Sequence, residues 1–394
     1  MLYKLLKSLP FRLLLCIIFA FLFGNYLNDS IIQALYTISF NLKEILMTIL
    51  PIIIFSYIFA AILSFKKGAP SLIIFIILLV TLSNATSSFI AYFVGKATIP
   101  YIAMEASLNI SIAQEITPYF SLNIPRIISS DKAMLSGLSL GILFCYFQNS
   151  FINRFAHNLQ DLVTNFLKKC FIPLLPLYVL GFILKMHREG ELSILFKNYS
   201  QVFIIICIVI ISYIFLLYFV ANKFSWKNTK SSLKEMMAAG LAGFSTISSA
   251  VTMPLTIAAT EKNLKNKEYA GLVIPTTVNI HMIGHGLSIP ITSLSILMLT
   301  GHDLPSLASF SMFVMYFCIA KFSASAVPGG GIIVILPILQ SQLGFSPEMC
   351  SIIVMLDILQ DAILTSANVM GNGAFAMISY RIYNKLKALG NIPK

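Results

Sequence analysis

The stretch "SIIVMLDILQDAILTSANVMGNGAFAMISY" (residues Ser351–Tyr380) decides the fold, because it joins a long apolar segment to two carboxylates. Its length and composition predict a helix that crosses a membrane. Asp357 and Asp361 are four residues apart and therefore share one helical face. Polar residues continue that face at steps of three and four: Thr365, Asn368, Asn372. The sequence thus predicts a polar strip along an apolar helix.

The two carboxylates need partners if they lie inside a membrane. A charge at the bilayer centre costs about 3 kcal/mol or more. No Lys or Arg occurs between Ile332 and Tyr380 to neutralise them. A bound cation, a proton or the ammonium group of a ligand would supply the missing charge, which predicts a cation-linked site. The alternative is that both carboxyls are protonated or hydrogen-bonded between helices.

The composition is that of an integral membrane protein. Of 394 residues, 58% are hydrophobic and 11% are charged, whereas soluble domains carry about 25% charge. The net charge of +12 comes largely from lysines that cluster at the ends of apolar spans, where membrane topology places them. We therefore expect membrane lipid as a partner and no nucleic acid. The six cysteines form no CxxC pair, so we interpret them as small buried hydrophobic residues rather than disulfides or metal ligands. We expect no metal site and no cofactor apart from a co-transported proton or sodium ion.

The distribution of lysine and arginine predicts the topology. Lys4, Lys7 and Arg12 precede the first span, and Lys385 and Lys387 lie near the C-terminus. Cytoplasmic segments carry the excess of basic residues, so both termini are predicted to be cytoplasmic. We expect a multi-pass protein of the plasma (inner) membrane with about eight transmembrane helices. The opening apolar segment has no small-residue cleavage site and is interpreted as a retained first helix.

Two apolar segments are interrupted. The segment Met236–Thr260 has a hydroxyl-rich centre and starts and ends beside basic, cytoplasmic loops, so we expect it to enter the membrane and return as a re-entrant hairpin. A second segment, residues 311–344, contains Pro328 followed by three glycines, a run that breaks a helix. Paired interruptions of this kind indicate the binding site of a transporter. The alternative is an ordinary kinked helix in each place.

Two histidines lie in the apolar stretch "VIPTTVNIHMIGHGLSIPI" (Val273–Ile291). His281 and His285 are about one helical turn apart, so a metal site, a proton relay and a buried structural pair are all open. The spacing also matches the H-E-x-x-H helix of zinc proteases. Met282 stands where that motif has its general-base Glu, and no third ligand is evident. An intramembrane metalloprotease is therefore a minor alternative, and we predict no enzymatic activity.

Several motifs in order resemble the dicarboxylate/amino acid:cation symporter family, which has the glutamate-transporter fold. "TISSAVTMP" (Thr246–Pro254) and "AVPGGG" (Ala326–Gly331) resemble the tips of its two hairpins. "DILQDAILTSANVMGN" (Asp357–Asn372) resembles its last helix, and "LKEILMTILPIIIFSYI" (Leu42–Ile58) its second. The resemblance implies an all-α integral membrane fold of about eight transmembrane helices plus two re-entrant helical hairpins, arranged as inverted repeats. It also implies alternating access and a homotrimer.

The seventh helix departs from the family pattern P-x-G-A-T-x-N-M-D-G-T-A-L. From Pro275 this chain reads P-T-T-V-N-I-H-M-I-G-H-G-L. Ile283 then replaces the Asp that helps to hold sodium in the family. Because isoleucine has no oxygen and histidine titrates near neutrality, we expect coupling to protons or another cation. The residues predicted to couple the cation or proton are His281, His285, Asn279, Asp357, Asn368 and Asn372.

The predicted substrate follows from a second departure. Leu364 occupies the position at which members with acidic substrates have an arginine that clamps the side-chain carboxylate. The resemblance implies that Asp361 holds the α-ammonium group and that Asn368 with the hairpin tips holds the α-carboxylate. The predicted substrate-binding residues are Ser248, Ser249, Val327, Pro328, Gly329, Asp361, Leu364, Thr365 and Asn368.

The prediction is therefore a symporter for a small, neutral amino acid. The first alternative is a symporter for a dicarboxylate or an acidic amino acid (glutamate or aspartate), driven by sodium or protons. An ion channel is a further alternative. Four parts are expected along the chain: scaffold helices in 1–69 and 200–228, a third helix and outer loop in 70–131, a fourth and fifth helix in 132–199, and a transport core in 229–394.

Overall fold

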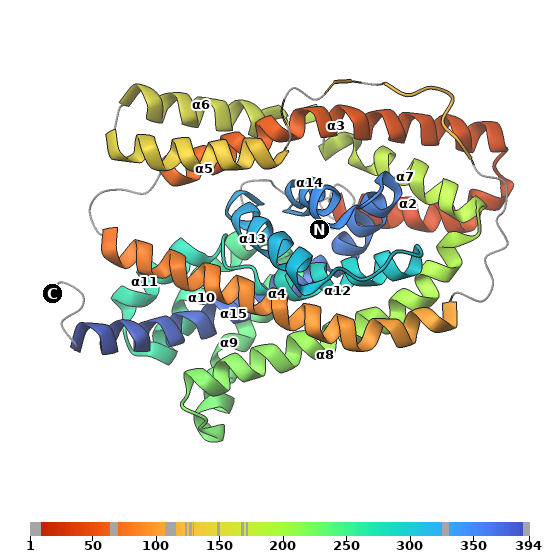
Figure 1. The fold of residues 1–394 in the computed structure, drawn as a ribbon. Helices are drawn as coiled ribbons and strands as arrows, with labels where there is room; N and C mark the ends of the chain where they lie inside the picture. The colour runs from red at the N-terminus through yellow and green to blue at the C-terminus, as the bar shows by residue number, and fades with distance from the viewer. Residues whose placement is uncertain are drawn as a thin grey trace. The chain divides into compact units, whose positions relative to one another are not determined.

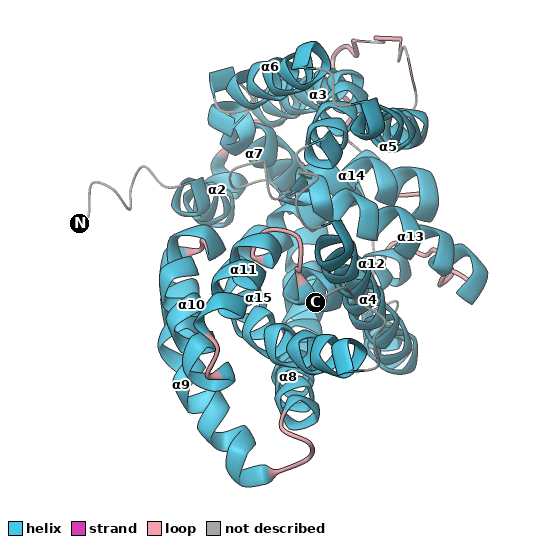
Figure 2. Cartoon of the chain, turned by 90° about the vertical axis from the view of Figure 1, so that its left-hand side faces the viewer, coloured by secondary structure: helices cyan, strands magenta, loops and turns pink. Residues whose placement is uncertain are grey.

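Helices make up the regular structure of the described chain. The computed structural model describes residues 9–63, 70–106, 116–122, 124–125, 128, 130–147, 150–166, 169–170, 172–324 and 331–388. Among these residues there is no strand (Figure 2). The predicted all-α class is confirmed. The number of membrane crossings and the re-entrant character of the two hairpins stay predictions.

The helices follow one another along the chain, with the longest connection between α4 and α5 (Figure 1). Their bounds are α2 Leu9–Phe23, η1 Gly24–Tyr26, α3 Asp29–Leu63, α4 Pro70–Ala106, α5 Ser130–Phe147, α6 Ser150–Phe166, α7 Ile172–Arg188, α8 Glu191–Ala221, α9 Trp226–Thr246, α10 Ser249–Leu264, α11 Lys267–Thr277, α12 Ile283–Leu299, α13 Leu307–Ala324, α14 Gly331–Leu343 and α15 Pro347–Ala388. The stretch Ser351–Tyr380, with its predicted polar strip, lies within α15.

Three described helices are long and apolar enough to cross a membrane, judged by length and composition. They include the segments Phe75–Ile102, Tyr199–Ala221 and Pro347–Lys387. The helices α12, α13 and α14 contain shorter apolar segments. A membrane protein is therefore indicated, as predicted.

The chain forms two compact units. Unit 1 contains residues 1–64, 95–202 and 292–359, and unit 2 contains residues 65–94, 203–291 and 360–394. The divisions fall inside α4, α8, α12 and α15, so each of these helices contributes a segment to both units. The predicted partition into scaffold helices and a transport core stays a proposal.

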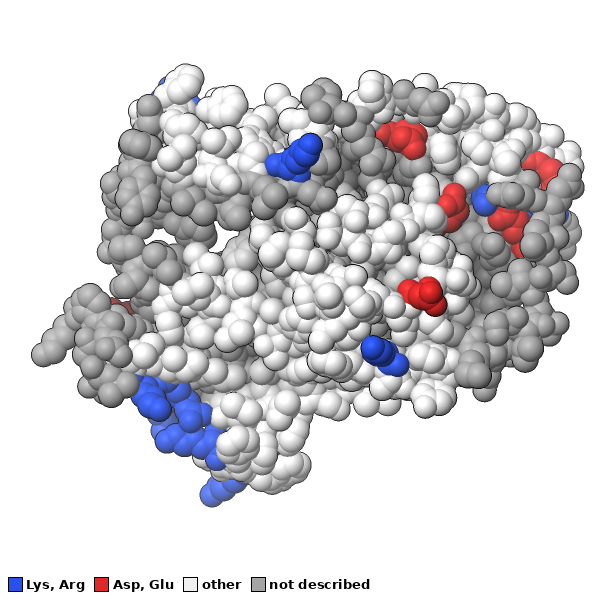
Figure 3. Space-filling view, viewed as in Figure 1, with Lys and Arg blue, Asp and Glu red and all other residues white. Residues whose placement is uncertain are grey.

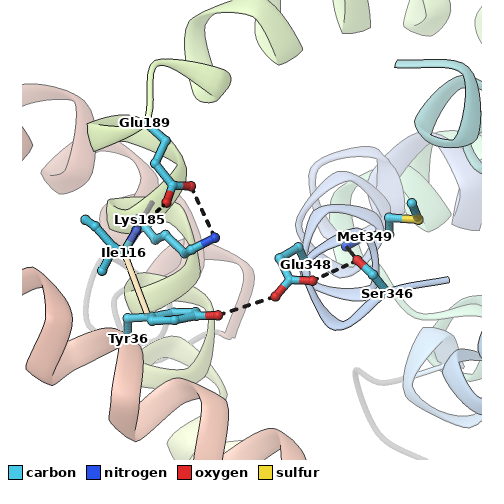
Figure 4. A network of polar contacts seen from close by, with 7 residues as sticks. All are labelled: Tyr36, Ile116, Lys185, Glu189, Ser346, Glu348 and Met349. Carbon is cyan, nitrogen blue, oxygen red and sulfur yellow. Dashed lines mark hydrogen bonds and ion pairs between the residues drawn. The ribbon is translucent and has the colours of Figure 1, made fainter. Parts of the chain in front are cut away.

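In unit 1, α3 packs against α5, α6 and α7, and a polar network joins α3 and α7 to the start of α15 (Figure 4). Lys185 is buried, with its Nζ 3.2 Å from Glu189 and 5.3 Å from the centre of the Tyr36 ring. The Tyr36 hydroxyl donates to Glu348 Oε1 at 3.3 Å, and Ser346 Oγ donates to Oε2 at 2.8 Å. Buried charges here are thus held by both ion pairing and hydrogen bonds.

In unit 2, α9 and α10 form a helical hairpin. Ile247 ends α9 in the left-handed region, with φ 51°, and Ser248 caps α10 by accepting from the Val251 N–H. The turn lies within the predicted first tip. Gly243 of α9 faces α15 so closely that an added Cβ would lie 3.1 Å from Val369 Cγ2. Small residues on α9 therefore allow it to pack directly on the polar helix.

Candidate functional site

The break between α11 and α12 is the centre of the candidate site. Helix α11 ends at Thr277 and α12 begins at Ile283, so the short connection 278–282 interrupts an apolar stretch. Backbone groups of such a break must be satisfied by protein when they lie at membrane depth. Three are satisfied locally: the Val278 N–H donates to Ile274 O at 2.9 Å, and the N–H groups of Ile280 and His281 donate to Thr277 O at 3.0 and 2.8 Å.

Asn84 of α4 satisfies two more backbone groups of the break. Its Nδ2 donates to Ile280 O at 2.8 Å, and its Oδ1 accepts from the Met282 N–H at 3.1 Å. The side chain is fully buried. An amide is suited to this role because it offers donors and an acceptor on one short stem. Asn84 therefore holds the connection from the α4 side.

Helix α15 supports the same break from its polar strip. Asn368 Oδ1 accepts from the Gly284 N–H at 2.8 Å, and its Nδ2 lies 3.0 Å from His285 Nδ1. Asn372 Nδ2 donates to Asn368 O at 2.8 Å and to His281 O at 3.4 Å. The predicted residues Asn368, Asn372, His281 and His285 are thus brought together within unit 2.

The contacts of Asn368 assign the protonation of His285. Because Asn368 Oδ1 is fixed by the Gly284 N–H, the amide presents its NH₂ group to the histidine. The NH₂ group can only donate, so His285 Nδ1 must accept and cannot carry a proton. A doubly protonated His285 would place two donors against each other. The described arrangement therefore contains His285 as a neutral ring.

His281 is packed as well as hydrogen-bonded. Its Nε2 lies 2.8 Å from Ser83 Oγ of α4, and its ring centre lies 4.5 Å from that of Phe375 on α15. The side chain is fully buried. These contacts fit the buried structural pair that the sequence left open, and a ring in contact with a hydroxyl could also exchange a proton with it.

The two carboxylates lie on different sides of the division within α15. Asp357 is buried and belongs to unit 1, whereas Asp361 is half-buried and belongs to unit 2. Thr365, one turn further, donates its hydroxyl to Asp361 Oδ1 at 3.1 Å. Within unit 2, Asp361 and Thr365 therefore continue the strip that reaches the break through Asn368.

The two departures from the family pattern, Ile283 and Leu364, are both fully buried. The side chain of Ile283 occupies the space that a Cβ on Gly371 would need. The backbone of Leu364 approaches α12 so closely that a Cβ on Gly284 would lie 2.5 Å from Leu364 O. Gly284 therefore permits α12 and α15 to meet at this point.

The other predicted residues make none of the contacts described above. Asn279 lies in the connection but is exposed. Ser248 lies in the turn of the α9–α10 hairpin and caps α10, and Ser249 is the first residue of α10. Three predicted substrate-binding residues lie outside the described residues: Val327, Pro328 and Gly329. The part they play in the second tip stays a prediction.

Asn84 and Ser83 are the residues that the sequence reasoning missed. They stand in "TLSNATSSF" (Thr81–Phe89), a polar run inside an otherwise apolar span. A buried asparagine in such a span is itself a functional signal, because polar groups in a membrane are retained only where they have partners. This signal was available, but the sequence does not say which backbone the amide would reach.

Comparison with known proteins identifies a family and several relatives. The profile described as "Sodium:dicarboxylate symporter family" matches residues 9–382. The chain is 31% identical over 174 residues to an "Excitatory amino acid transporter" of Onchocerca volvulus, and this match covers 43% of this chain and 34% of that protein. It is 30% identical over 168 residues to the human "Excitatory amino acid transporter 2", and that match covers 42% of this chain and 28% of the human protein. The matches thus span about a third of the length of these relatives. The family and the relatives are transporters by description, not enzymes.

Proposed function

We propose a transport function from one premise: the chain belongs to the sodium:dicarboxylate symporter family. The protein is a secondary active transporter that couples a small carboxylate-bearing substrate to a cation and works by alternating access. The observation that carries this proposal is the interrupted α11–α12 segment, tied by Asn84 and Asn368 in unit 2. Broken helices that meet polar side chains of a neighbouring helix are typical of transporter binding sites.

For the substrate, we propose a dicarboxylate or an acidic amino acid, which was the first alternative to a neutral amino acid on the sequence alone. Both the family description and the names of the relatives favour it over a neutral amino acid. In this proposal Asp361 holds the ammonium group of an amino acid substrate, and Asn368 with the two hairpin tips holds its α-carboxylate. Leu364 offers no hydrogen-bond donor to the second carboxylate of such a substrate, so another group must bind it.

A neutral amino acid is the second candidate, and Leu364 is the observation that favours it. A buried leucine offers no donor to a carboxylate, and an unpaired buried charge costs several kcal/mol. Replacing Leu364→Arg should raise uptake of aspartate relative to alanine if the neutral reading holds. If wild-type protein already prefers aspartate, another group supplies the donor and the neutral reading fails.

Different observations support sodium and the proton as the coupled cation. The family description names sodium, and Asn372 Oδ1 is a buried oxygen that has no hydrogen-bond partner among the described residues. A carbonyl oxygen of this kind suits a hard cation. The proton is favoured by Ile283, which brings a hydrocarbon side chain to the position at which the family has an Asp.

The moving parts are proposed as the sequence analysis divided them. Residues 1–69 and 200–228 serve as the scaffold, and 229–394 serve as the transport core, with the tip that contains Pro328 as the outer gate. The protein assembles as a homotrimer in the plasma (inner) membrane with both termini in the cytoplasm. Crosslinking of single-cysteine variants in whole cells, with reagents that do not cross the membrane, would test both the assembly and the topology.

Uptake into proteoliposomes tests the central proposal. Purified protein is given radiolabelled aspartate, succinate or alanine, with a sodium gradient at equal pH or a pH gradient at equal sodium. We expect saturable uptake and counterflow that one of the two gradients drives. Asp361→Asn should abolish uptake of the amino acids, whereas Asp303→Asn, an exposed control, should not. Flux without saturation or counterflow would indicate a channel, and no flux with any substrate would overturn the proposal.

A further inference from the structure

The turn between α8 and α9 presents an exposed aromatic pair at the end of an apolar helix. Phe224 and Trp226 are 65% and 67% exposed. Both are nevertheless positioned by α8, because Trp226 packs on Phe215 with ring centres 5.3 Å apart and Phe224 meets Phe219 at the same distance. The four rings therefore form a fixed group where the membrane-length segment Tyr199–Ala221 ends.

The backbone of this turn is held in an unfavourable conformation. Lys223 and Phe224 have φ angles of 55° and 62°, in the left-handed region. That region is unfavourable for a residue with a side chain, whereas glycine adopts it freely. A hydrogen bond from the Phe224 N–H to Phe219 O at 2.8 Å closes the turn. Both side chains are exposed. Strained backbone of this kind tends to occur at functional positions.

The lysines on either side of the aromatic pair have no acidic residue between them in sequence. Between Asn222 and Lys234 the chain contains four lysines and no Asp or Glu. They are all exposed, and none forms an ion pair with a described carboxylate: Lys223, Lys227, Lys230, Lys234. Figure 3 shows Lys and Arg side chains gathered at the lower left, over the part of unit 2 that contains α9, α10 and their connections. The helix α9 begins here too, and its N-terminal dipole adds positive potential.

A second basic loop in unit 2 provides a contrast. The segment Glu261–Glu268 contains three lysines and two glutamates. Its Lys262 is also paired, with Nζ 3.1 Å from Glu235 of α9. The positive charge of that loop is thus largely balanced, whereas the charge of the α8–α9 turn is not.

We propose that Lys223, Lys227 and Lys230, together with Phe224 and Trp226, bind the headgroup of an anionic phospholipid. Aromatic rings at the end of a membrane helix occupy the level of the headgroups. Lysines just outside the span then reach the phosphates, as basic clusters next to transmembrane helices do. The order of rings at the membrane boundary and ammonium groups beyond it fits a lipid better than a soluble anion. This inference is independent of which substrate the protein transports.

Trp226 allows a direct test, because it is the only tryptophan in the chain. The full chain is reconstituted in phosphatidylcholine vesicles that contain a minor fraction of phosphatidylglycerol, with bromine placed on the acyl chains of one lipid at a time. Bromine quenches tryptophan fluorescence on contact, so the two preparations compare the lipids around Trp226. We expect phosphatidylglycerol to quench Trp226 at least about threefold more strongly than its share of the bilayer predicts. The reason is that each lysine near the surface strengthens anionic-lipid binding severalfold.

Two sets of substitutions make the test specific. The preference is the quenching by phosphatidylglycerol divided by the quenching that its share of the bilayer predicts. Replacing Lys223, Lys227 and Lys230 by Gln should lower this ratio to about one, while phosphatidylcholine still quenches Trp226. The matched control replaces three lysines of the balanced loop by Gln: Lys262, Lys265, Lys267. It should keep the preference, and high salt should weaken the preference in the wild type. Three results would overturn the proposal: quenching by the two lipids in proportion to their shares of the bilayer in the wild type, quenching by neither lipid, or the same loss of preference in both sets.

Discussion

Replacing Asn84→Ala is the sharpest test of how the break between α11 and α12 is held. The substitution removes a side chain that is fully buried and makes two hydrogen bonds to the connection, at 2.8 Å to Ile280 O and 3.1 Å from the Met282 N–H. Alanine fits the space but can neither donate nor accept. Both backbone groups then lose the Asn84 side chain as a partner at a depth where water is scarce.

The size of the effect follows from the two lost bonds. Leaving one buried polar group unsatisfied costs about 1–3 kcal/mol, so Asn84→Ala should destabilise the connection by about 2–6 kcal/mol. Since each 1.4 kcal/mol corresponds to a factor of ten, even the lower limit implies that local opening becomes roughly 30 times more frequent. The loss should be concentrated at the break, because the helix α4 keeps its own backbone bonds.

Hydrogen–deuterium exchange of the purified protein measures this loss where it occurs. The peptide that contains the Met282 N–H should exchange at least about 30 times faster in the variant, and the apparent Tm should fall. Asn228→Ala, at an exposed position of α9, serves as the control and should change neither quantity. Unchanged exchange at the break in Asn84→Ala would refute the reasoning, because it would mean that other groups hold the connection.

Three further outcomes follow from single contacts. Gly284→Ala should destabilise the protein by about 1–3 kcal/mol, because the added Cβ would lie 2.5 Å from a backbone oxygen of α15. The control Gly271→Ala has open space around it and should leave the Tm unchanged or slightly higher. Equal changes in Tm for the two variants would contradict the close approach of α12 and α15. Asn368→Leu leaves the Gly284 N–H without its acceptor and should lower the free energy of unfolding by about 1–3 kcal/mol, which chemical denaturation would measure; a neutral result would show that the bond contributes nothing. Tyr36→Phe removes the hydroxyl that donates to Glu348 and should cost about 0.5–1.5 kcal/mol; a loss above about 3 kcal/mol in the same assay would mean that the hydroxyl does more than donate this one bond.

The sequence alone was sufficient to predict helix α15 and its polar strip. The spacing of Asp361, Thr365 and Asn368 places them on one face of any helix, so α15 and its strip could be expected before the structure. The turn at Ser248 was also predictable, because a hydroxyl-rich centre between two apolar runs favours a helix cap. These features depend on neighbours within a few residues along the chain.

The contacts of the candidate site could not be predicted in this way. Asn84 binds a backbone group 196 residues away in Ile280, and no periodicity in either segment points to the other. The neutral state of His285 likewise depends on Asn368, which is fixed in turn by the Gly284 N–H. Composition showed that these polar groups needed partners but gave no means of choosing them.

The sequence by itself determined that this protein is helical, lies in a membrane and carries carboxylates along one face of an apolar helix. Those properties follow from the cost of charge in hydrocarbon and from helical periodicity, which act locally. Only the tertiary structure decided that the connection after α11 is held by Asn84 and Asn368, and that Ile283 and Leu364 pack against α15 and α12. Which group satisfies a buried donor, and how closely two backbones approach, depend on the segment that folding brings alongside.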